Sequence, residues 1–94
     1  MIKIHVRLLG DLREAIRKER LEIELPNNTS LKELIENKLL RYEGLKGQII
    51  DPVTKRIRTD LIILINERSI ESFIESERVK DGDTVTIASV VAGG

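Results

Sequence analysis

The chain has 94 residues, enough for one domain, and 40% of them are apolar, with only Tyr42 and Phe73 aromatic, so Ile, Leu and Val must build the core. Its 16 basic and 16 acidic residues cancel, which argues against general binding to nucleic acid or to an anionic membrane surface. The absence of cysteine excludes disulfides, thiolate metal sites and a cysteine nucleophile. Charges interrupt the first apolar residues and no apolar run could span a bilayer, so we expect no signal peptide and a cytoplasmic protein.

The first third of the chain predicts a strand, a short helix and a second strand. Apolar and polar residues alternate over residues 2–8, which is the period of a strand with one buried face. Gly10 breaks this pattern, and residues 11–14 (Asp-Leu-Arg-Glu) resemble a capping box that would begin a helix over about residues 12–18. Alternation returns over residues 21–25, and residues 26–28 (Pro-Asn-Asn) predict a turn.

A longer helix is predicted from about residue 31 to residue 42. Ser30 and Glu33 have the spacing of a capping box, in which each side chain accepts a hydrogen bond from the backbone N–H of the other residue. Gly44 suits the left-handed residue that commonly follows the last turn of a helix. The apolar residues of this segment recur at helical spacing: Leu31, Leu34, Ile35, Leu39 and Tyr42.

The second half of the chain predicts a loop, two further strands and an irregular segment. Residues 47–59 have no long period, and their basic cluster at 55–58 favours a solvated loop, with contact to phosphate or to an acidic partner as the alternative. The unbroken apolar run over residues 61–65 is typical of a strand covered on both faces. Residues 66–69 and 80–83 predict turns, and residues 84–87 alternate as the last strand. The irregular segment between these turns has four expected anchors: Ile70, Phe73, Ile74 and Val79.

This order of elements predicts an α+β fold. One amphipathic helix cannot cover both faces of a sheet, so the simplest arrangement is a roll in which one main helix crosses one face of a mixed sheet of about four to five strands. The sequence has no internal repeat and no linker. We therefore expect one domain over residues 1–90 and a flexible tail over residues 91–94.

The sequence contains no recognisable catalytic constellation. His5 is the only histidine, so a metal site built on several imidazoles is excluded, and its place on the polar side of the first strand favours an exposed residue. Without cysteine or the spacing of a Ser-His-Asp triad, no side chain is placed to act as an activated nucleophile. The glycines before the tail are scattered, so a glycine-rich phosphate loop is absent. We expect no metal site and no catalytic side chain.

The C-terminal residues Val91, Ala92, Gly93 and Gly94 are the unusual chemical feature of the chain. The last two residues have no Cβ, so the tail can lie extended in a slot too narrow for other residues. Its carboxylate is ionised at neutral pH and is a poor electrophile until it is activated, for example by adenylation with ATP. One interpretation is a carrier whose reactive group is its own last residue. The other is a frayed end, because chain termini are often disordered.

Several segments together resemble the ubiquitin-like sulfur carriers, and in particular the small subunit of molybdopterin synthase and its archaeal relatives. Residues 12–14 (Leu-Arg-Glu), 41–45 (Arg-Tyr-Glu-Gly-Leu) and 65–70 (Ile-Asn-Glu-Arg-Ser-Ile) are similar to segments of that family in the same order. Residues 80–85 followed by 91–94 are the most specific match.

Two positions depart from the pattern of that family. Glu67 stands where the family usually has glycine, which predicts a turn of different backbone shape. Residues 88–90 (Ala-Ser-Val) stand where an aromatic-proline-proline stretch is common, and the missing prolines predict a looser tail.

The resemblance implies a β-grasp fold and a chemical role for the C-terminus. An adenylating enzyme of the ubiquitin-activating type would use ATP to convert the Gly94 carboxylate to an acyl-adenylate, and sulfur transfer would then yield a thiocarboxylate. The large subunit of molybdopterin synthase would receive the tail, and the sulfur would pass to a pterin precursor of the molybdenum or tungsten cofactor. In this scheme Gly94 reacts, Gly93 fits the slot, and Val91 and Ala92 pack at its entrance. Exposed apolar residues on the face of the last strand would form part of the docking surface.

Two alternatives stay open at this point. The tail could be joined to lysines of target proteins, as in ubiquitin-like modifiers, or the domain could be an interaction module of the same fold without tail chemistry. No permanently bound cofactor is expected, since the partner enzyme uses the ATP, and the chain would be a carrier or a small synthase subunit without a catalytic site of its own. The sequence does not distinguish pterin, thiazole or tRNA as the sulfur acceptor, and it leaves open the oligomeric state and any processing that exposes Gly94.

Overall fold

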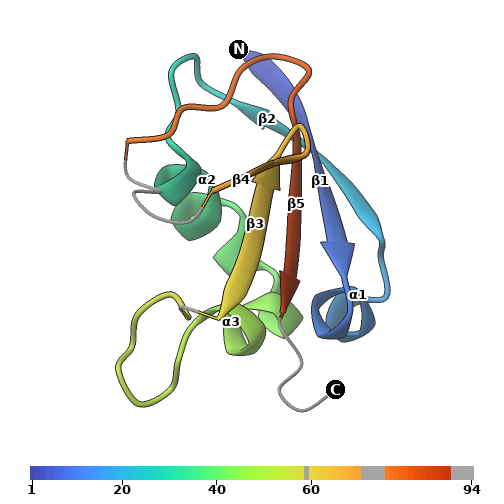
Figure 1. The fold of residues 1–94 in the computed structure, drawn as a ribbon, viewed down its shortest axis with the longest axis vertical. Coiled ribbons are helices and arrows are strands. Elements are labelled where there is room, and N and C mark those ends of the chain that lie inside the picture. The colour runs from blue at the N-terminus through green and yellow to red at the C-terminus, as the bar shows by residue number, and fades with distance from the viewer. Residues whose placement is uncertain (59, 71–75, 90–94) are drawn as a thin grey trace.

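The computed structural model describes residues 1–58, 60–70 and 76–89. All strands in this part of the chain belong to one mixed sheet, so the predicted α+β class is confirmed (Figure 1). The elements follow in the order β1 (Ile2–Leu9), α1 (Asp11–Ile16), β2 (Arg20–Leu25), α2 (Leu31–Asn37), the 3₁₀ helix η1 (Leu39–Arg41), α3 (Glu43–Ile49), β3 (Leu61–Ile65), β4 (Arg68–Ser69) and β5 (Thr84–Ser89).

The last strand lies in the middle of the sheet. The strand order is β2-β1-β5-β3-β4, with β5 parallel to β1 and antiparallel to β3. Val85 is paired with Val6 on one side and with Ile65 on the other, so β5 joins the first strand of the chain to the strand after the helices. This central position predicts that β5 has little freedom to move relative to the rest of the domain.

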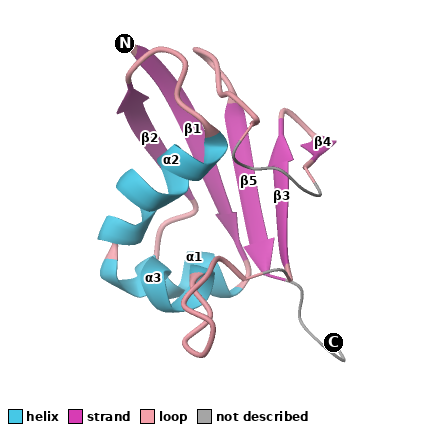
Figure 2. Ribbon diagram, turned by 90° about the vertical axis from the view of Figure 1, so that its left-hand side faces the viewer, coloured by secondary structure: helices cyan, strands magenta, loops and turns pink. Residues whose placement is uncertain are grey.

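The core lies between the sheet and the helices, which cover one face only (Figure 2). It consists of Ile, Leu and Val, as the composition predicted, and burial of each such side chain stabilises the fold by roughly 1.5–3 kcal/mol. Within the described part of the chain, no helix has the length and apolar character needed to cross a membrane. The largest fully buried side chains are Ile4, Val6, Leu8, Leu12, Leu25, Leu31, Leu34, Ile35, Leu39, Leu45, Ile49 and Ile87.

Helix α1 forms where the sequence predicted a short helix, but it begins and ends differently. Its N-cap residue is Gly10, and the helix start has no side-chain cap hydrogen bond, so the predicted capping box from Asp11 is wrong. Gly10 has a φ of 61°, a conformation open to glycine, and this turns the chain from β1 directly into the helix one residue early. The helix ends at Ile16 because Arg17 has a left-handed φ of 57°.

Helix α2 begins with the predicted capping box. The Ser30 hydroxyl accepts a hydrogen bond from the Glu33 N–H at 3.0 Å, and the Glu33 carboxylate accepts one from the Ser30 N–H at 3.0 Å. The hydrogen bonds with the backbone and the hydroxyl of Ser30 are the main cause of the lowered pKa of Glu33. Burial opposes them, and the charge of Arg78 makes a smaller lowering contribution to this pKa. Arg78 itself donates to the Glu33 carboxylate at 3.3 Å, so the cap also connects the helix to the segment before β5.

The prediction of one continuous helix up to residue 42 is wrong. Helix α2 ends before Lys38, and the chain continues as the separate helices η1 and α3. Tyr42 is extended, with a φ of −80° and a ψ of 113°, and this redirects the chain so that Leu45 and Ile49 of α3 reach the core. Gly44 therefore lies inside a helix and is not the left-handed residue after one. A Cβ at Gly44 would lie 2.6 Å from the carbonyl oxygen of Ala15, so glycine permits the close packing of α3 against α1.

The segment after α3 is the predicted solvated loop, shortened by that helix. Ile50 and Ile57 form an isolated bridge at its base, and the Asp51 carboxylate accepts hydrogen bonds from the backbone N–H groups of Val53 and Thr54. Val53 is 86% exposed. In the basic cluster, Arg58 donates to both carboxylate oxygens of Asp60, at 2.9 and 2.5 Å. This pair raises the pKa of Arg58 and lowers the pKa of Asp60.

Among the described residues, strand β3 is covered on one face only, so the prediction of a strand buried on both faces is wrong. Ile63 and Ile65 are 4% exposed and face the helices, whereas Ile62 is 45% exposed on the other face. The hairpin turn that follows was predicted, and it places Asn66 and Glu67 at φ values of 49° and 71°. Such a pair of left-handed residues is typical of a tight hairpin and usually contains glycine.

Only some of the predicted anchors of the irregular segment lie in the described part of the chain. Ile70 and Val79 are buried, as predicted, at 8% and 2% exposure. Phe73 and Ile74 lie outside the described residues.

Candidate functional site

Strand β5 holds the chain in place up to the residues that precede the tail. Its last pairs join Ala88 to Leu9 of β1 and Ser89 to Leu61 of β3. This end of β5 lies beside α1 and α3, at the opposite end of the molecule from the N-terminus (Figure 1). The predicted site residues lie outside the described residues, so their roles stay predictions: Val91, Ala92, Gly93 and Gly94.

The start of β5 is fixed by hydrogen bonds between the predicted turns at 66–69 and 80–83. The Asn66 side chain donates to the Asp83 carboxylate at 2.8 Å and accepts from the Thr84 N–H at 2.9 Å. Asp81 accepts from the Lys3 N–H at 2.8 Å, which ties the same turn to β1. The sequence pattern predicted both turns but not the hydrogen bonds that link them. Asn66 in the first turn was the only signal in the sequence for these hydrogen bonds.

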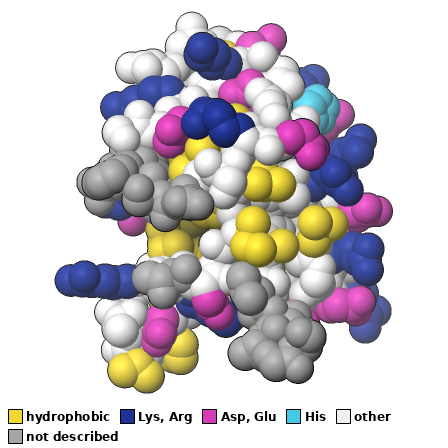
Figure 3. Space-filling model, viewed as in Figure 1, with side chains coloured by type: hydrophobic (Ala, Val, Ile, Leu, Met, Phe, Trp, Pro, Cys, Tyr) yellow, Lys and Arg dark blue, Asp and Glu magenta, His cyan; other side chains and the backbone are white. Residues whose placement is uncertain are grey.

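An apolar patch lies on the outer face of the sheet, which carries no described helix. We define the outer-face patch as Leu9, Ile62, Leu64 and Ala88. Ala88 is paired with Leu9 on one side and with Ile62 on the other, and Leu64 is paired with Thr86 in the next row. Paired residues on adjacent strands point to the same face, so these side chains lie together. Apolar side chains indeed gather near the middle of this face (Figure 3).

The other half of the outer face is charged. Lys3, His5 and Arg7 alternate on β1, and Glu22 and Glu24 lie on the outer side of β2. His5, which was predicted to be exposed, keeps 36% of its side-chain surface, and its Nδ1 lies 3.9 Å from the Glu22 carboxylate. An apolar half beside the tail end of β5 and a charged half away from it give this face the composition of a protein-docking surface.

The described residues contain no group of three or more acidic or histidine side chains that could hold a metal ion. One polar group near the tail stands out. The Ser89 hydroxyl is buried and has no hydrogen-bond partner among the described residues. Buried hydroxyls are normally hydrogen-bonded, so this group is an exception among the described residues.

The family of the chain follows from a comparison with known proteins. The sequence profile of the ThiS family matches residues 6–94, nearly the whole chain. The chain belongs to the ThiS family. The resemblance to ubiquitin-like sulfur carriers is thereby confirmed, and the mixed sheet with its helices on one face agrees with the predicted β-grasp fold. None of the curated protein sequences matches this ThiS-family chain.

Solved structures share the fold over the full length of the chain. The small archaeal modifier protein 1 (SAMP1) from Methanosarcina acetivorans is 25% identical, with a TM-score of 0.79, over 100% of this chain and 98% of that chain. A chain of the complex of subunits 1 and 2 of molybdopterin-converting factor from Helicobacter pylori 26695 is 27% identical, with a TM-score of 0.65, over 99% and 100%. A chain of the Amycolatopsis orientalis BexX/CysO complex is 28% identical, with a TM-score of 0.67, over 97% and 99%. These relatives of the ThiS-family chain thus include proteins that bind a partner.

Proposed function

We propose that the chain is a cytoplasmic sulfur carrier that supplies sulfur for molybdopterin synthesis as the small subunit of molybdopterin synthase. The observation that carries this proposal is the diglycine at residues 93–94, which follows three residues after the central strand of a ThiS-family domain. The likeness to a chain of the molybdopterin-converting factor complex supports the choice of this pathway.

The chemistry would take place at Gly94 in two steps. A carboxylate oxygen of Gly94 attacks the α-phosphorus of ATP, and pyrophosphate leaves, which gives an acyl-adenylate. A sulfur nucleophile supplied as sulfide or persulfide then attacks the acyl carbon, and AMP leaves with the carboxylate oxygen. Reduction of the persulfide bond by a thiol completes the thiocarboxylate where a persulfide is the donor. An adenylating enzyme of the ubiquitin-activating type would bind the ATP.

The geometry of the domain supports a carrier. Residues 90–94, fully extended, span at most roughly 16–18 Å, so the active site of each partner must lie within that distance of the end of β5. Because β5 is paired on both sides up to Ala88, the domain defines the point from which the tail starts. We propose that the outer-face patch docks the adenylating enzyme and the large synthase subunit in turn. Val91, Ala92 and Gly93 would then line the entry of the tail into their active sites.

An intact-mass measurement tests the chemistry. The full chain is incubated with ATP, a cognate adenylating enzyme and a sulfur source, and we expect the mass increase of one oxygen-to-sulfur exchange. A chain without Gly94 should keep its fold and show no exchange. Exchange in the truncated chain, or none in the full chain with its cognate enzyme, would contradict the proposal.

Docking is tested separately by a matched pair of substitutions. Ile62→Asp places a charge in the outer-face patch, whereas Val53→Asp places one at the 86% exposed tip of the loop after α3. We expect Ile62→Asp to abolish retention of the large synthase subunit in a pull-down, because a charge would be desolvated at the contact. Val53→Asp should leave retention unchanged, and equal behaviour of the two variants would exclude the patch as the docking site.

The second candidate function is a ubiquitin-like modifier joined through Gly94 to lysines of target proteins. The likeness to the small archaeal modifier protein 1 from Methanosarcina acetivorans favours it. Adenylation is common to both functions, so they are not exclusive. A search for a Gly-Gly remnant on lysines of cellular proteins after protease digestion separates them, since only conjugation leaves that remnant.

The third candidate is an interaction module of the same fold without tail chemistry. One alanine appended after Gly94 would block the reactions of the carrier and of the modifier. Unchanged cellular activity of that chain would favour the interaction module.

A further inference from the structure

Strand β2 is an open edge of the sheet. Among the described strands it pairs only with β1. The Leu8 N–H donates to the Glu19 carbonyl at 2.8 Å, and this bond sets which residues of β2 bond to β1, because bonded pairs alternate in an antiparallel ladder. The N–H and C=O groups of Arg20, Glu22 and Glu24 therefore point away from β1, where an added strand could bond to them.

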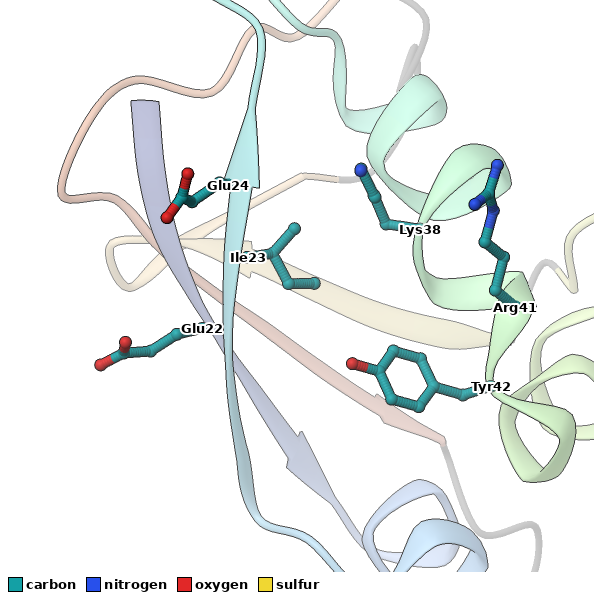
Figure 4. Close-up of a pocket in the computed structure, with 6 residues that line it drawn as sticks. All are labelled: Glu22, Ile23, Glu24, Lys38, Arg41 and Tyr42. Atoms are coloured by element: carbon teal, nitrogen blue, oxygen red, sulfur yellow. The ribbon is translucent and has the colours of Figure 1, made fainter. Parts of the chain in front are cut away.

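A groove of about 440 Å³ runs beside this edge, between β2 and the helices. Figure 4 shows Ile23 pointing from β2 toward the helices, with Tyr42 facing it and Lys38 and Arg41 on the same wall. The groove thus offers an apolar contact at Ile23, an aromatic ring with a hydroxyl at Tyr42, and positive charge. A strand added to β2 would project every second side chain into it.

The two sides of the β2 edge have opposite charge. Lys38 and Arg41 form no ion pair and no side-chain hydrogen bond with the described residues, so their charges are available to a ligand. Glu22 and Glu24 also line the groove where β2 borders it, but their carboxylates point to the opposite side of the strand (Figure 4). Successive side chains of an added strand would meet positive charge on one side and negative charge on the other.

We propose that the β2 edge and its groove bind an extended segment of a partner protein that adds a strand to the sheet. Its groove-facing side chains are acidic and apolar, and its outward side chains are basic. A second copy of the chain is disfavoured as the occupant, because pairing through β2 would bring Glu22 and Glu24 close to the same residues of the other copy. This binding needs neither the tail nor the outer-face patch, so it does not depend on the proposed sulfur transfer.

A peptide of matching chemistry tests this inference on the full chain. The probe is a terminally blocked peptide of eight residues with Asp and Val at one set of alternate positions and Lys and Thr at the other. A scrambled peptide of the same composition that breaks the alternation is the control. We expect the alternating peptide to shift the backbone resonances of β2 and to slow amide exchange at Arg20, Glu22 and Glu24, and the scrambled peptide to do neither.

Two variants test separately how the groove charges and the backbone groups of the β2 edge contribute to peptide binding. Lys38→Glu with Arg41→Glu should weaken binding about tenfold or more, while Arg13→Glu with Lys46→Glu, at exposed positions of α1 and α3, should leave it unchanged. Glu22→Pro removes one outward N–H, which an edge strand tolerates, and should also weaken binding.

The inference is overturned by any of three results. The first is absence of binding at millimolar peptide, and the second is a set of resonance shifts confined to the outer-face patch. The third is slowed exchange along β2 that appears with rising protein concentration and no peptide, since that would make a second copy the occupant.

Discussion

The two faces of the sheet have different reasons for their apolar residues. On the inner face, Ile63 and Ile65 are almost completely buried beneath the helices, and their apolar character is explained by stability. On the outer face, Ile62 and Leu64 come from the same strand but have no described helix over them, so the fold itself does not require them to be apolar. Neighbouring residues of β3 therefore differ in role: the inner-face residues stabilise the core, and the outer-face residues belong to the proposed docking patch.

Substitution of the neighbouring residues Ile63 and Ile62 gives the sharpest test of this difference. Ile63→Ala should lower the free energy of unfolding by about 2–5 kcal/mol, because it leaves a cavity in the core. Ile62→Ala should change it by no more than about 0.5 kcal/mol, as for most surface positions. Urea unfolding of both variants measures the effects. Equal losses would show that the outer face contributes to stability as much as the inner face.

Substitutions of two glycines in α3 test how closely the helices on the inner face pack against one another. Gly44→Ala should destabilise the domain by about 1–3 kcal/mol, because its Cβ would lie 2.6 Å from the Ala15 carbonyl oxygen. Gly47→Ala is the matched control, since no described atom beyond its chain neighbours and its own helix backbone lies within 4 Å of its Cβ position, and it should stabilise the helix by up to about 1 kcal/mol. Thermal unfolding followed by circular dichroism compares them. A stabilising Gly44→Ala would refute the proposed close contact of α1 and α3.

The cap at the start of α2 is expected to make the next largest contribution to the stability of the domain. Ser30→Ala removes the hydroxyl that accepts from the Glu33 N–H and should cost about 1 kcal/mol. Ser30→Asp keeps an acceptor at the cap position and should recover most of this loss. Urea unfolding of both variants gives the values, and equal instability of the two would show that capping is not the cause.

The smallest expected effect is a pH dependence from Glu33. Its pKa is lowered in the folded chain by the hydrogen bonds with Ser30, so the stabilisation is fully present above the ordinary carboxyl pKa of about 4.3. It is lost as the pH falls through the lowered value. Glu33→Gln should therefore differ from the parent chain at neutral pH, and the difference should narrow in acid. Urea unfolding across pH 2–7 measures this. Glu36→Gln, at an exposed position of α2, controls for the loss of one carboxylate.

Local patterns in the sequence predicted β1, β2, β3 and β5, the turns and the cap of α2, but β4 was missed because its residues were assigned to a turn. Alternation gave β1 and β2 within about one residue, and the spacing of Ser30 and Glu33 gave the start of α2, because these features depend on neighbours in the chain. The break after α2 and the packing role of Gly44 were missed. The role of Gly44 depends on its contact with Ala15 of α1, which is distant in sequence, and no short-range period reveals it.

The candidate site was predictable only in part. The diglycine was evident as a chemical feature, and its family was identified from the order of several short segments. The apolar run of β3 could not show that one face is open, since continuous apolar residues have no period that distinguishes the faces. The outward N–H and C=O groups of β2 follow from strand order and register, which the sequence pattern did not supply.

The place of β5 makes the whole sheet depend on a strand from the last part of the chain. Translation adds this strand after all the others, yet it occupies the middle of the sheet. A chain interrupted before Thr84 would leave β1 with β2 and β3 with β4 as separate hairpins, and such hairpins have marginal stability alone. A chain that ends before this strand would therefore lack the folded surface on which docking is proposed.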